Sequence, residues 1–403
     1  MEADRANVAA AEQILVVLSD IEIGAGGPTD DFPQSRSIGD LLDHYNTGQR
    51  AGVAVHLVLN GDTFDFLKTS VDGHYPRHVT EAIAVQKLTR VHAAHGDFFD
   101  GLRRFLAGGG ARRDISFIVG NHDPELLFPG VQRRVRDLLG DGARVHFPGF
   151  SLAIGDVWVE HGSQLDPLFS MDANALFRRH RGQRVLNLPW GSVAVIDVAL
   201  PMHEQLYHLD RLKPREHLMA KLPEFRELII GKYWRYWTRD FWKGFAGDPT
   251  RQISWTMVKE IAYRFVSEDA DVRVVEAHRK QLTSDPRYAV RVVGHEHEPG
   301  WWSHGNQRLL RTGAFRNEFM MHDSDDALEQ LRPVHAEVWL RNGRAVRSQL
   351  VENDCTAPPP GYVLSSLDDL LPTIRGLLAS LEGRASIDAE QAAQTAKEVR
   401  QTR

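Results

Sequence analysis

Seven side chains in this sequence could bind metal, and each of them closely follows a short apolar run. The set is Asp20, Glu22, Asp62, Asn121, His161, His295 and His297. All of them offer oxygen or imidazole nitrogen, the ligands that suit Mn, Fe, Zn or Mg rather than a soft metal. Seven donors exceed the ordinary coordination of one ion and are about right for two ions that share a bridging carboxylate.

The apolar runs predict a sheet that brings these side chains together. Residues 14–18, 54–59 and 115–119 read as buried strands, separated by helix-like stretches at 38–50 and 79–106. This βαβ alternation is typical of a parallel sheet covered by helices. Further strands are predicted at 151–154, 157–160, 290–293, 308–311 and 336–340. Ligands bind at the carboxyl ends of strands in open α/β sheets, so we expect one shared site there.

Glycines accompany the polar clusters at the strand ends. Gly61, Gly120 and Gly294 directly precede candidate ligands, and Gly162 directly follows one. Glycine adopts backbone conformations that other residues avoid. We therefore expect these glycines to allow sharp turns that aim the adjacent side chains inward.

The middle of the chain differs from the strand-rich parts. Residues 165–285 read as mainly helical, and we interpret them as an insertion or lid between a first core part, 1–164, and a second core part, 286–354. The segment "TAPPPGY" after Cys355 is typical of a linker. Residues 355–403 are predicted to form this linker and a helical tail, with one amphipathic run at 363–381.

Composition and charge limit the classes of protein. The net charge of -6 and the pI near 6.3 argue against a surface built mainly to bind nucleic-acid phosphates. With Cys355 as its one cysteine, the chain can form neither an internal disulfide nor a thiolate cluster for metal. No segment reaches the roughly 18 apolar residues of a spanning helix, and the N-terminus lacks an apolar signal region. We expect no transmembrane segment and a cytoplasmic location.

Five short motifs follow one another along the chain: Asp20-Ile21-Glu22, Gly61-Asp62-Thr63-Phe64-Asp65, Gly120-Asn121-His122-Asp123, His161-Gly162 and Gly294-His295-Glu296-His297. In this order they resemble the calcineurin-like metallophosphoesterase superfamily. The resemblance covers roughly residues 14–317 and implies a four-layer α/β/β/α sandwich with a large helical insertion. "EHGSQLDP" and "LRTGAFR" are similar to bacterial enzymes of the UDP-2,3-diacylglucosamine pyrophosphatase type.

The resemblance also implies roles for individual residues. One metal would be held by Asp20, the residue at 22, Asp62 and His297, and a second by Asp62, Asn121, His161 and His295. A hydroxide bridging the two ions would attack a phosphodiester or pyrophosphate bond. His122 would act as general acid or charge stabiliser, oriented by Asp65, and we expect Asp123 to hold its loop. Mn is the favoured metal, with Fe, Zn or Mg as alternatives.

Glu22 departs from the family pattern, which has histidine at this position. Glutamate can ligate through oxygen and would favour a harder ion such as Mn or Mg. A second interpretation is a weakened site with one metal or none. A third is that Glu22 points to solvent and Asp20 alone anchors the first ion.

The substrate is the least defined feature of the sequence. Residues 228–245 place Trp234, Trp237, Phe241 and Phe245 at helical spacing with basic residues between them. These aromatics either pack inside a helical lid, or cover a lipid-like substrate or a membrane surface. We expect a phosphate-ester small molecule or lipid-like substrate, with peripheral membrane contact left open. The alternatives are a phosphomonoesterase acting on a small metabolite and a catalytically weak scaffold or membrane-docking protein.

Overall fold

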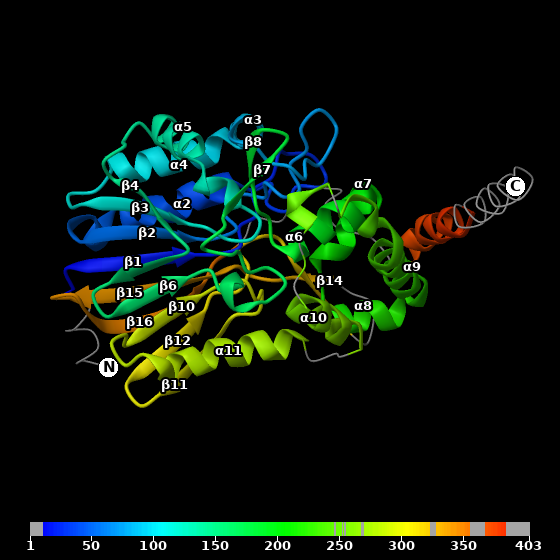
Figure 1. Ribbon diagram of the computed structural model, residues 1–403. Helices are drawn as coiled ribbons and strands as arrows, with labels where there is room; N and C mark the ends of the chain where they lie inside the picture. The colour runs from blue at the N-terminus through cyan, green and yellow to red at the C-terminus, as the bar shows by residue number, and fades with distance from the viewer. Residues whose placement is uncertain are drawn as a thin grey trace, which may run out of the picture.

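Two β-sheets lie face to face between two layers of helices (Figure 1). The computed structural model describes residues 11–245, 247–251, 253, 255–266, 270–322, 328–354 and 367–383. The six-stranded sheet has the order β16-β15-β1-β2-β3-β4, and the five-stranded sheet has the order β11-β12-β10-β6-β5. The predicted four-layer α/β/β/α sandwich is confirmed.

The first sheet combines a parallel centre with an antiparallel edge. Its strands are β1 (Gln13–Leu18), β2 (Ala54–Asn60), β3 (Arg113–Ile118), β4 (Val145–Gly149), β15 (Val334–Arg341) and β16 (Arg344–Glu352). Strands β1 to β4 run parallel, as predicted, whereas β15 pairs antiparallel with β1 and β16 antiparallel with β15. The chain therefore returns to this sheet after building the second one.

The second sheet is parallel at its centre and antiparallel at both edges. Its strands are β5 (Ser151–Ile154), β6 (Val157–Glu160), β10 (Val290–Val293), β11 (Gly300–His304) and β12 (Gln307–Arg311). β10 pairs parallel with β6 and β12, and β5 and β11 close the edges in antiparallel pairs. The strands predicted at 151–154, 157–160 and 290–293 coincide with β5, β6 and β10.

The core is layered because the central strands are apolar on both faces. Leu15, Val17 and Val58 meet Val159 and Val292 between the two sheets. The opposite face of the first sheet packs against α2 (Arg36–Tyr45), α3 (Glu81–Ala94), α4 (Gly96–Ala107) and α5 (Pro129–Leu139). The second sheet is covered by α11 (Ala270–Ser284). Continuous apolar runs such as 14–18 suit strands buried on both sides.

The helical stretch predicted at 79–106 is two helices rather than one. Thr80 begins α3 by accepting a hydrogen bond from the Ile83 N–H at 3.3 Å, as expected of an N-cap. His95 leaves the helical conformation between α3 and α4. Its Nε2 lies 2.7 Å from Asp30 Oδ2, and this buried contact fixes the break.

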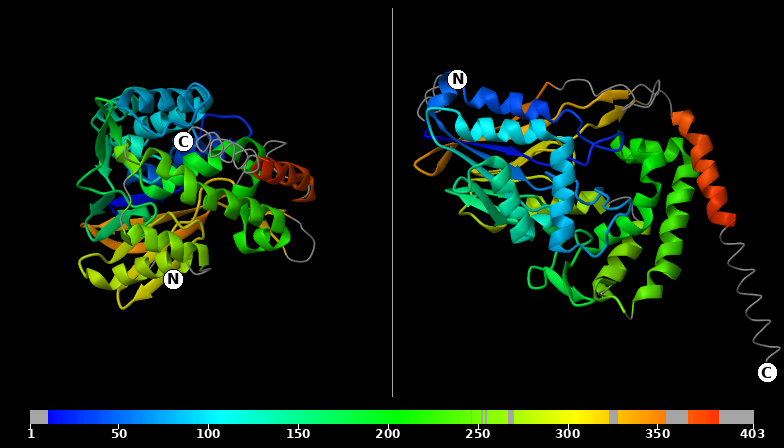
Figure 2. Two further views of the ribbon diagram at one scale, coloured as in Figure 1. Left: turned by 45° about the vertical axis from the view of Figure 1, so that its right-hand side comes forward. Right: turned by 90° about the horizontal axis from the view of Figure 1, so that it is seen from above.

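The predicted insertion forms helices and a hairpin, most of them at one end of the sandwich, whereas its last helix, α11, covers the second sheet (Figure 2). Its elements are β7 (Phe177–His180), β8 (Gln183–Leu186), α6 (Trp190–Ala194), α7 (His203–Leu206), β9 (Leu212–Lys213), α8 (Arg215–Lys221), α9 (Pro223–Arg235), α10 (Trp255–Val266) and α11. β9 joins β13 (Phe319–Met321) and β14 (Leu328–Gln330) in a small sheet. Ile374, in the helical residues 371–383, packs with Leu228 of α9.

Two further expectations concern the ends of the molecule. Residues 355–366, which hold the predicted linker and the start of the amphipathic run, lie outside the described residues. The boundaries assigned to core, insertion and tail stay predictions. Among the described helices, none combines the length and apolar character needed to cross a bilayer.

Candidate metal centre

The predicted ligands meet where strands of both sheets end. Asn60, the last residue of β2, joins the sheets, because its Nδ2 donates to the Glu160 carbonyl oxygen at 2.9 Å. A cavity of about 550 Å³ opens at this edge and is lined by Glu22, Asp62, Asn121, His295 and His297. Asp20 and His161 are almost fully buried beneath it. The seven side chains therefore belong to one site.

His161 aims one ring nitrogen at two oxygen ligands. Its Nδ1 lies 3.0 Å from the Asn60 carbonyl oxygen, which can accept only if Nδ1 carries a hydrogen. Its Nε2 lies 3.2 Å from Asp62 Oδ2 and 3.1 Å from Asn121 Oδ1. If Nδ1 carries the only ring proton, Nε2 presents a lone pair. The lone pairs of Nε2, Asp62 Oδ2 and Asn121 Oδ1 then face one another, and this arrangement needs a cation or an extra proton between them.

His297 repeats this arrangement on the other side of Asp20. Its Nδ1 lies 2.6 Å from Glu318 Oε1. Its Nε2 lies 3.6 Å from Asp20 Oδ1 and 3.8 Å from Glu22 Oε1. A carboxylate that fixes the remote nitrogen of a histidine is the usual support of a metal-binding imidazole.

Asp20 provides the test of whether a metal fits. Its Oδ2 accepts the His295 backbone N–H at 3.0 Å, but its Oδ1 is buried and has no hydrogen-bond partner. Burial and the carboxylates of Asp62 and Glu22 raise the pKa of Asp20 well above its usual range, although His161 lowers it. A buried oxygen without a partner is costly, and a divalent cation would relieve the cost. The residues present fit a metal.

Strained backbone supports the same interpretation. Asp20, Glu22, Asp62 and His295 have φ values of 54°, 51°, 50° and 69°. Residues other than glycine rarely adopt this left-handed region, and such strain concentrates at functional sites. Four of the seven predicted ligands are therefore held in costly conformations that aim their side chains inward.

Two of the glycines act differently from our expectation. Gly120 and Gly294 do not adopt positive φ. A Cβ at Gly120 would lie 2.1 Å from Asp62 Oδ1, and one at Gly294 would lie 2.6 Å from Asp20 Oδ2. Glycine is needed at these positions because the carboxylates occupy the space of a side chain.

His295 lies at the cavity edge with a partner that the sequence did not reveal. Its Nε2 is 3.3 Å from Asp166 Oδ2, so Nδ1 is the ring nitrogen left to face a metal. The rings of His295 and His161 are 5.3 Å apart. Asp166 belongs to the "SQLDP" segment, whose strand-end position was the available signal.

His122 and its neighbours are held in place by several hydrogen bonds. His122 Nδ1 lies 3.0 Å from Asp65 Oδ1, and the His122 N–H donates to Asp62 Oδ1 at 2.7 Å. Asp123 accepts the N–H groups of Thr63 and Gly120 at 2.8 and 2.7 Å, so it holds the loop as predicted. Burial would lower the pKa of His122, yet Glu22, Asp62 and Asp65 raise it to about 10.

Glu22 is almost fully buried, which excludes the interpretation that it points to solvent. Its Oε2 accepts from Arg316 Nη1 at 2.8 Å and from Lys68 Nζ at 3.0 Å. Its Oε1 faces His297. One oxygen is thus bound by two cations, and the other remains on the side of the proposed first metal.

Sequence reasoning missed the ionic network that supports Glu22. Lys68 also lies within 2.6 Å of Asp31 Oδ2 and 2.9 Å of Asp210 Oδ2. Arg316 also contacts Asp210 at 3.1 Å and Glu318 at 3.0 Å. "LRTGAFR" contains Arg316, but nothing local in the sequence indicates that Asp210 of the insertion reaches it.

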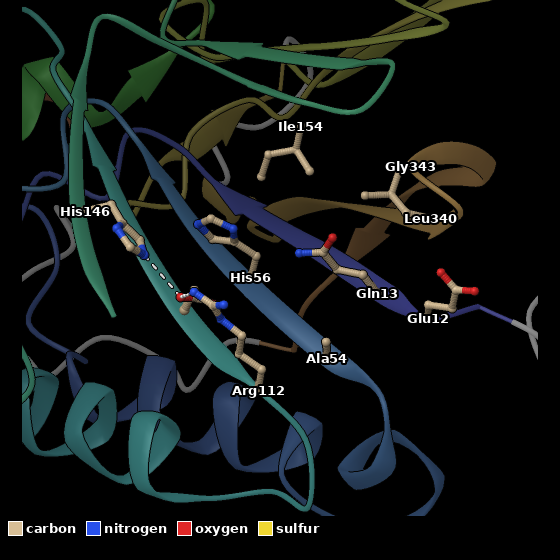
Figure 3. A pocket seen from close by; sticks show the side chains of 10 residues that line it. Glu12, Gln13, Ala54, His56, Arg112, His146, Ile154, Leu340 and Gly343 are labelled. Carbon is tan, nitrogen blue, oxygen red and sulfur yellow. Dashed lines mark hydrogen bonds and ion pairs between the residues drawn. The ribbon is translucent and has the colours of Figure 1, made fainter. Parts of the chain in front are cut away.

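A second cavity of about 470 Å³ lies at the opposite, amino end of the strands (Figure 3). His56, Arg112, Asp114 and His146 line it, together with residues from β1, β5 and β15. His146 Nε2 lies 3.1 Å from Asp114 Oδ1, and Arg112 binds the same carboxylate at 2.6 and 2.9 Å. None of the predicted ligands lines this cavity.

Comparison with known proteins gives matches at the level of overall arrangement. No family model matches the sequence, and no curated protein matches it at a significant level. An archaeal phosphodiesterase is 10% identical, with 84% of this chain and 99% of that chain covered and a TM-score of 0.28. Vps29 with Zn²⁺ from Entamoeba histolytica is 10% identical, with coverages of 84% and 98% and a TM-score of 0.26. For a phosphopantetheinyl hydrolase from Mycobacterium tuberculosis the identity is 10%, the coverages are 80% and 96%, and the TM-score is 0.25. Values this low carry no information about the reaction, which depends on the geometry of the site itself.

Proposed function

We propose that this chain is a metal-dependent phosphoesterase of the calcineurin-like superfamily that hydrolyses a phosphodiester or pyrophosphate bond. The observation that carries the proposal is the buried, unpartnered Oδ1 of Asp20, which lies 3.6 Å from His297 Nε2 and 4.0 Å from His161 Nε2. A buried carboxylate oxygen without a hydrogen-bond partner, with two imidazole nitrogens nearby, is a favourable position for a cation.

The ligands divide into two groups around Asp62 and Asp20. Asp20, Glu22, Asp62 and His297 would hold one ion, and Asp62, Asn121, His161 and His295 the other, with Asp62 shared. The predominance of oxygen donors favours Mn or Mg over Zn. When bound, such ions lower the pKa of a water and neutralise phosphoryl oxygens.

The chain itself contributes positioning and proton transfer. His122 borders the cavity, and Asp65 fixes its ring through Nδ1, which leaves Nε2 to donate a proton to the leaving oxygen. The backbone contact from His122 to Asp62 ties this loop to the shared ligand. Lys68 and Arg316 hold Glu22 in place through its other oxygen.

The experiment is a paired assay with metal analysis. Protein stripped with chelator and reloaded with Mn should hydrolyse bis-p-nitrophenyl phosphate faster than p-nitrophenyl phosphate. A preference for the monoester would favour the phosphomonoesterase alternative. A protein that neither binds Mn in titration nor turns over either substrate with any divalent metal would support the scaffold alternative and end this proposal.

The lipid-like substrate and membrane contact stay predictions within this proposal. Phe241 is buried in the insertion, as expected of a lid core, while Trp234, Trp242 and Phe245 are exposed. Exposed aromatic residues beside Lys243 are compatible with an anionic membrane surface. Vesicle sedimentation with and without anionic lipid would test this contact.

A further inference from the structure

Arg311 lies beside the metal centre without taking part in it. It is the last residue of β12 and is the register partner of Val293 in β10, two residues before His295. Beyond it, the Ala314 N–H donates to the His297 carbonyl oxygen at 3.2 Å. Arg311 lines the same cavity of about 550 Å³ as the predicted ligands.

The charge of Arg311 is buried and only partly compensated. Only 6% of the residue is exposed, and its Nε has no hydrogen-bond partner. Among the described residues, its ion-pair partner is Glu298, at 3.8 Å, whose own side chain is 84% exposed. Burial lowers the pKa of the Arg311 guanidinium, and the carboxylates of Glu296 and Glu298 offset only part of this effect. A buried cation is usually fully hydrogen-bonded, and the Nε of Arg311 is not.

A tryptophan and a second arginine complete the group. The guanidinium carbons of Arg311 and Arg279 lie 5.1 and 4.5 Å from the ring centre of Trp302, within cation–π range. All three residues line the cavity. They come from β12, α11 and β11, which lie side by side at the lower edge of the sandwich (Figure 1). The indole ring thus organises two guanidinium groups at the wall of the site.

We propose that Arg311 and Arg279 bind a second oxyanion of the substrate, separate from the phosphoryl group that is hydrolysed. A guanidinium presents paired N–H donors that match a phosphate or carboxylate. The substrate class is therefore a phosphoester that carries a further phosphate or carboxylate. This inference rests on the proposed function for the identity of the neighbouring centre.

Calorimetry with non-hydrolysable ligands tests the subsite without turnover. The probes are alkane bisphosphonates with two to six carbons, the matching alkyl phosphonates with one charged group, and the matching phosphono-carboxylates, titrated into the Mn-loaded protein. At the best length, the bisphosphonate should bind about 10- to 100-fold more tightly than the monophosphonate, the range for charged hydrogen bonds. The phosphono-carboxylate identifies which oxyanion is preferred.

The variants assign the effect to named residues. Arg311→Gln should remove the advantage of the second charge while leaving monophosphonate binding unchanged. Arg308→Gln, on the same strand with its Nη1 3.5 Å from the Ser348 carbonyl oxygen, is the matched control and should keep the advantage. Arg279→Gln changes an exposed residue and should lose part of the advantage, so the test survives if Arg311→Gln fails to fold.

Two results would overturn the subsite. One is a wild-type protein in which no bisphosphonate length gains affinity, and the other is an advantage that persists in both Arg311→Gln and Arg279→Gln. Turnover of bis-p-nitrophenyl phosphate is measured separately. If the protein turns over this substrate but binds the bisphosphonate no more tightly than the monophosphonate, only the subsite is wrong. If the bisphosphonate binds more tightly but there is no turnover, only the proposed function is wrong.

Discussion

The two ends of the sandwich contain similar residues that differ in whether their polar groups are hydrogen-bonded. At the amino end, Asp114 is bonded by Arg112 and His146, and His56 Nε2 lies 2.8 Å from Ser116 Oγ. At the carboxyl end, the Oδ1 of Asp20 has no partner. Histidine, aspartate and arginine line both cavities, so residue types alone do not distinguish them.

The difference lies in whether the polar groups satisfy one another. Hydrogen bonds from Arg112 and His146 lower the pKa of Asp114 despite burial, whereas burial and nearby carboxylates raise the pKa of Asp20. Positive φ values occur at Asp20, Glu22 and Asp62, and at none of the residues that line the amino-end cavity except Gly343. A cluster that leaves its acceptors unpaired and strains its backbone is organised for a ligand, while a satisfied one stabilises the fold.

The largest expected effect is at the shared ligand. Asp62→Asn should abolish turnover and lower metal content, because it removes the carboxylate common to both ions while keeping an oxygen for the His122 N–H. Asp114→Asn is the matched change at the amino end and should keep activity. Metal analysis and the bis-p-nitrophenyl phosphate rate check both variants, and full activity in Asp62→Asn would show that the assignment is wrong.

The next effect separates proton transfer from metal binding. His122→Ala should reduce turnover by about 10² to 10⁴-fold, the usual range for a lost general acid, with metal stoichiometry unchanged. His146→Ala removes an imidazole from the opposite cavity and should leave turnover intact. Loss of metal in His122→Ala would instead identify His122 as a ligand.

Glu22 provides a smaller and more specific effect. Glu22→His should shift the metal preference from Mn and Mg toward Zn and Fe, because imidazole replaces a carboxylate. Glu22→Ala should weaken metal affinity by about 10- to 100-fold, as for other groups that support bound metals. It should also lower the free energy of unfolding by about 1–3 kcal/mol, because Arg316 and Lys68 each lose a charged hydrogen bond.

Activity is measured with each metal in the wild type, Glu22→His and Glu22→Ala. The free energy of unfolding of the same proteins is measured in urea. Identical metal preference and identical rate across the series would show that Glu22 is not a ligand. The unfolding data would then report only its ionic contacts with Lys68 and Arg316.

The smallest expected effect on activity is at the amino end. Burial lowers the pKa of His56 from 6.5 to about 4. Between these pH values the unfolded chain binds a proton that the folded chain does not, so stability is fully present above about pH 6.5 and declines toward pH 4. The loss is up to about 3 kcal/mol.

His56→Gln removes this titration, because glutamine keeps polar atoms near Ser116 without a proton to gain. Urea unfolding at several pH values should give a shallower decline in the variant, and turnover at pH 7 should match the wild type. Equal declines in the two proteins would mean that His56 is not the titrating group.

Sequence patterns predicted the central strands and the edge strand β5, but not the edge strands β4, β11 and β16. Residues 14–18 and 54–59 are apolar throughout because both faces of β1 and β2 are covered, and this produces an unambiguous signal. β16, Arg344–Glu352, is a partly exposed edge strand with charged and polar residues, and its sequence does not separate it from a loop. The antiparallel pairing of β15 likewise depends on the return of the chain, which no local pattern encodes.

In the site, too, residues in local sequence motifs were predicted, whereas residues that matter through distant contacts were not. Asp62 and His161 were recognisable because their motifs lie directly at strand ends. Lys68 and Glu318 were not, because their importance depends on contacts with residues such as Asp210 and His297 that only the folded chain brings near. Arg311 was predicted as part of a strand, but its buried charge becomes apparent only with the cavity in place.

The hydrogen bond from Asn60 to the Glu160 carbonyl, which ties one sheet to the other, has a consequence for assembly. Asp62 follows a strand of the first sheet, and His161, 3.2 Å away, follows a strand of the second. A partly folded chain with only the first sheet formed lacks the three histidines of the ligand set. Under the proposed function, metal would therefore select the docked sandwich, and its binding free energy would add to the stability of that state alone. Metal supply would then govern how much of the chain remains assembled, in addition to how fast the assembled protein works.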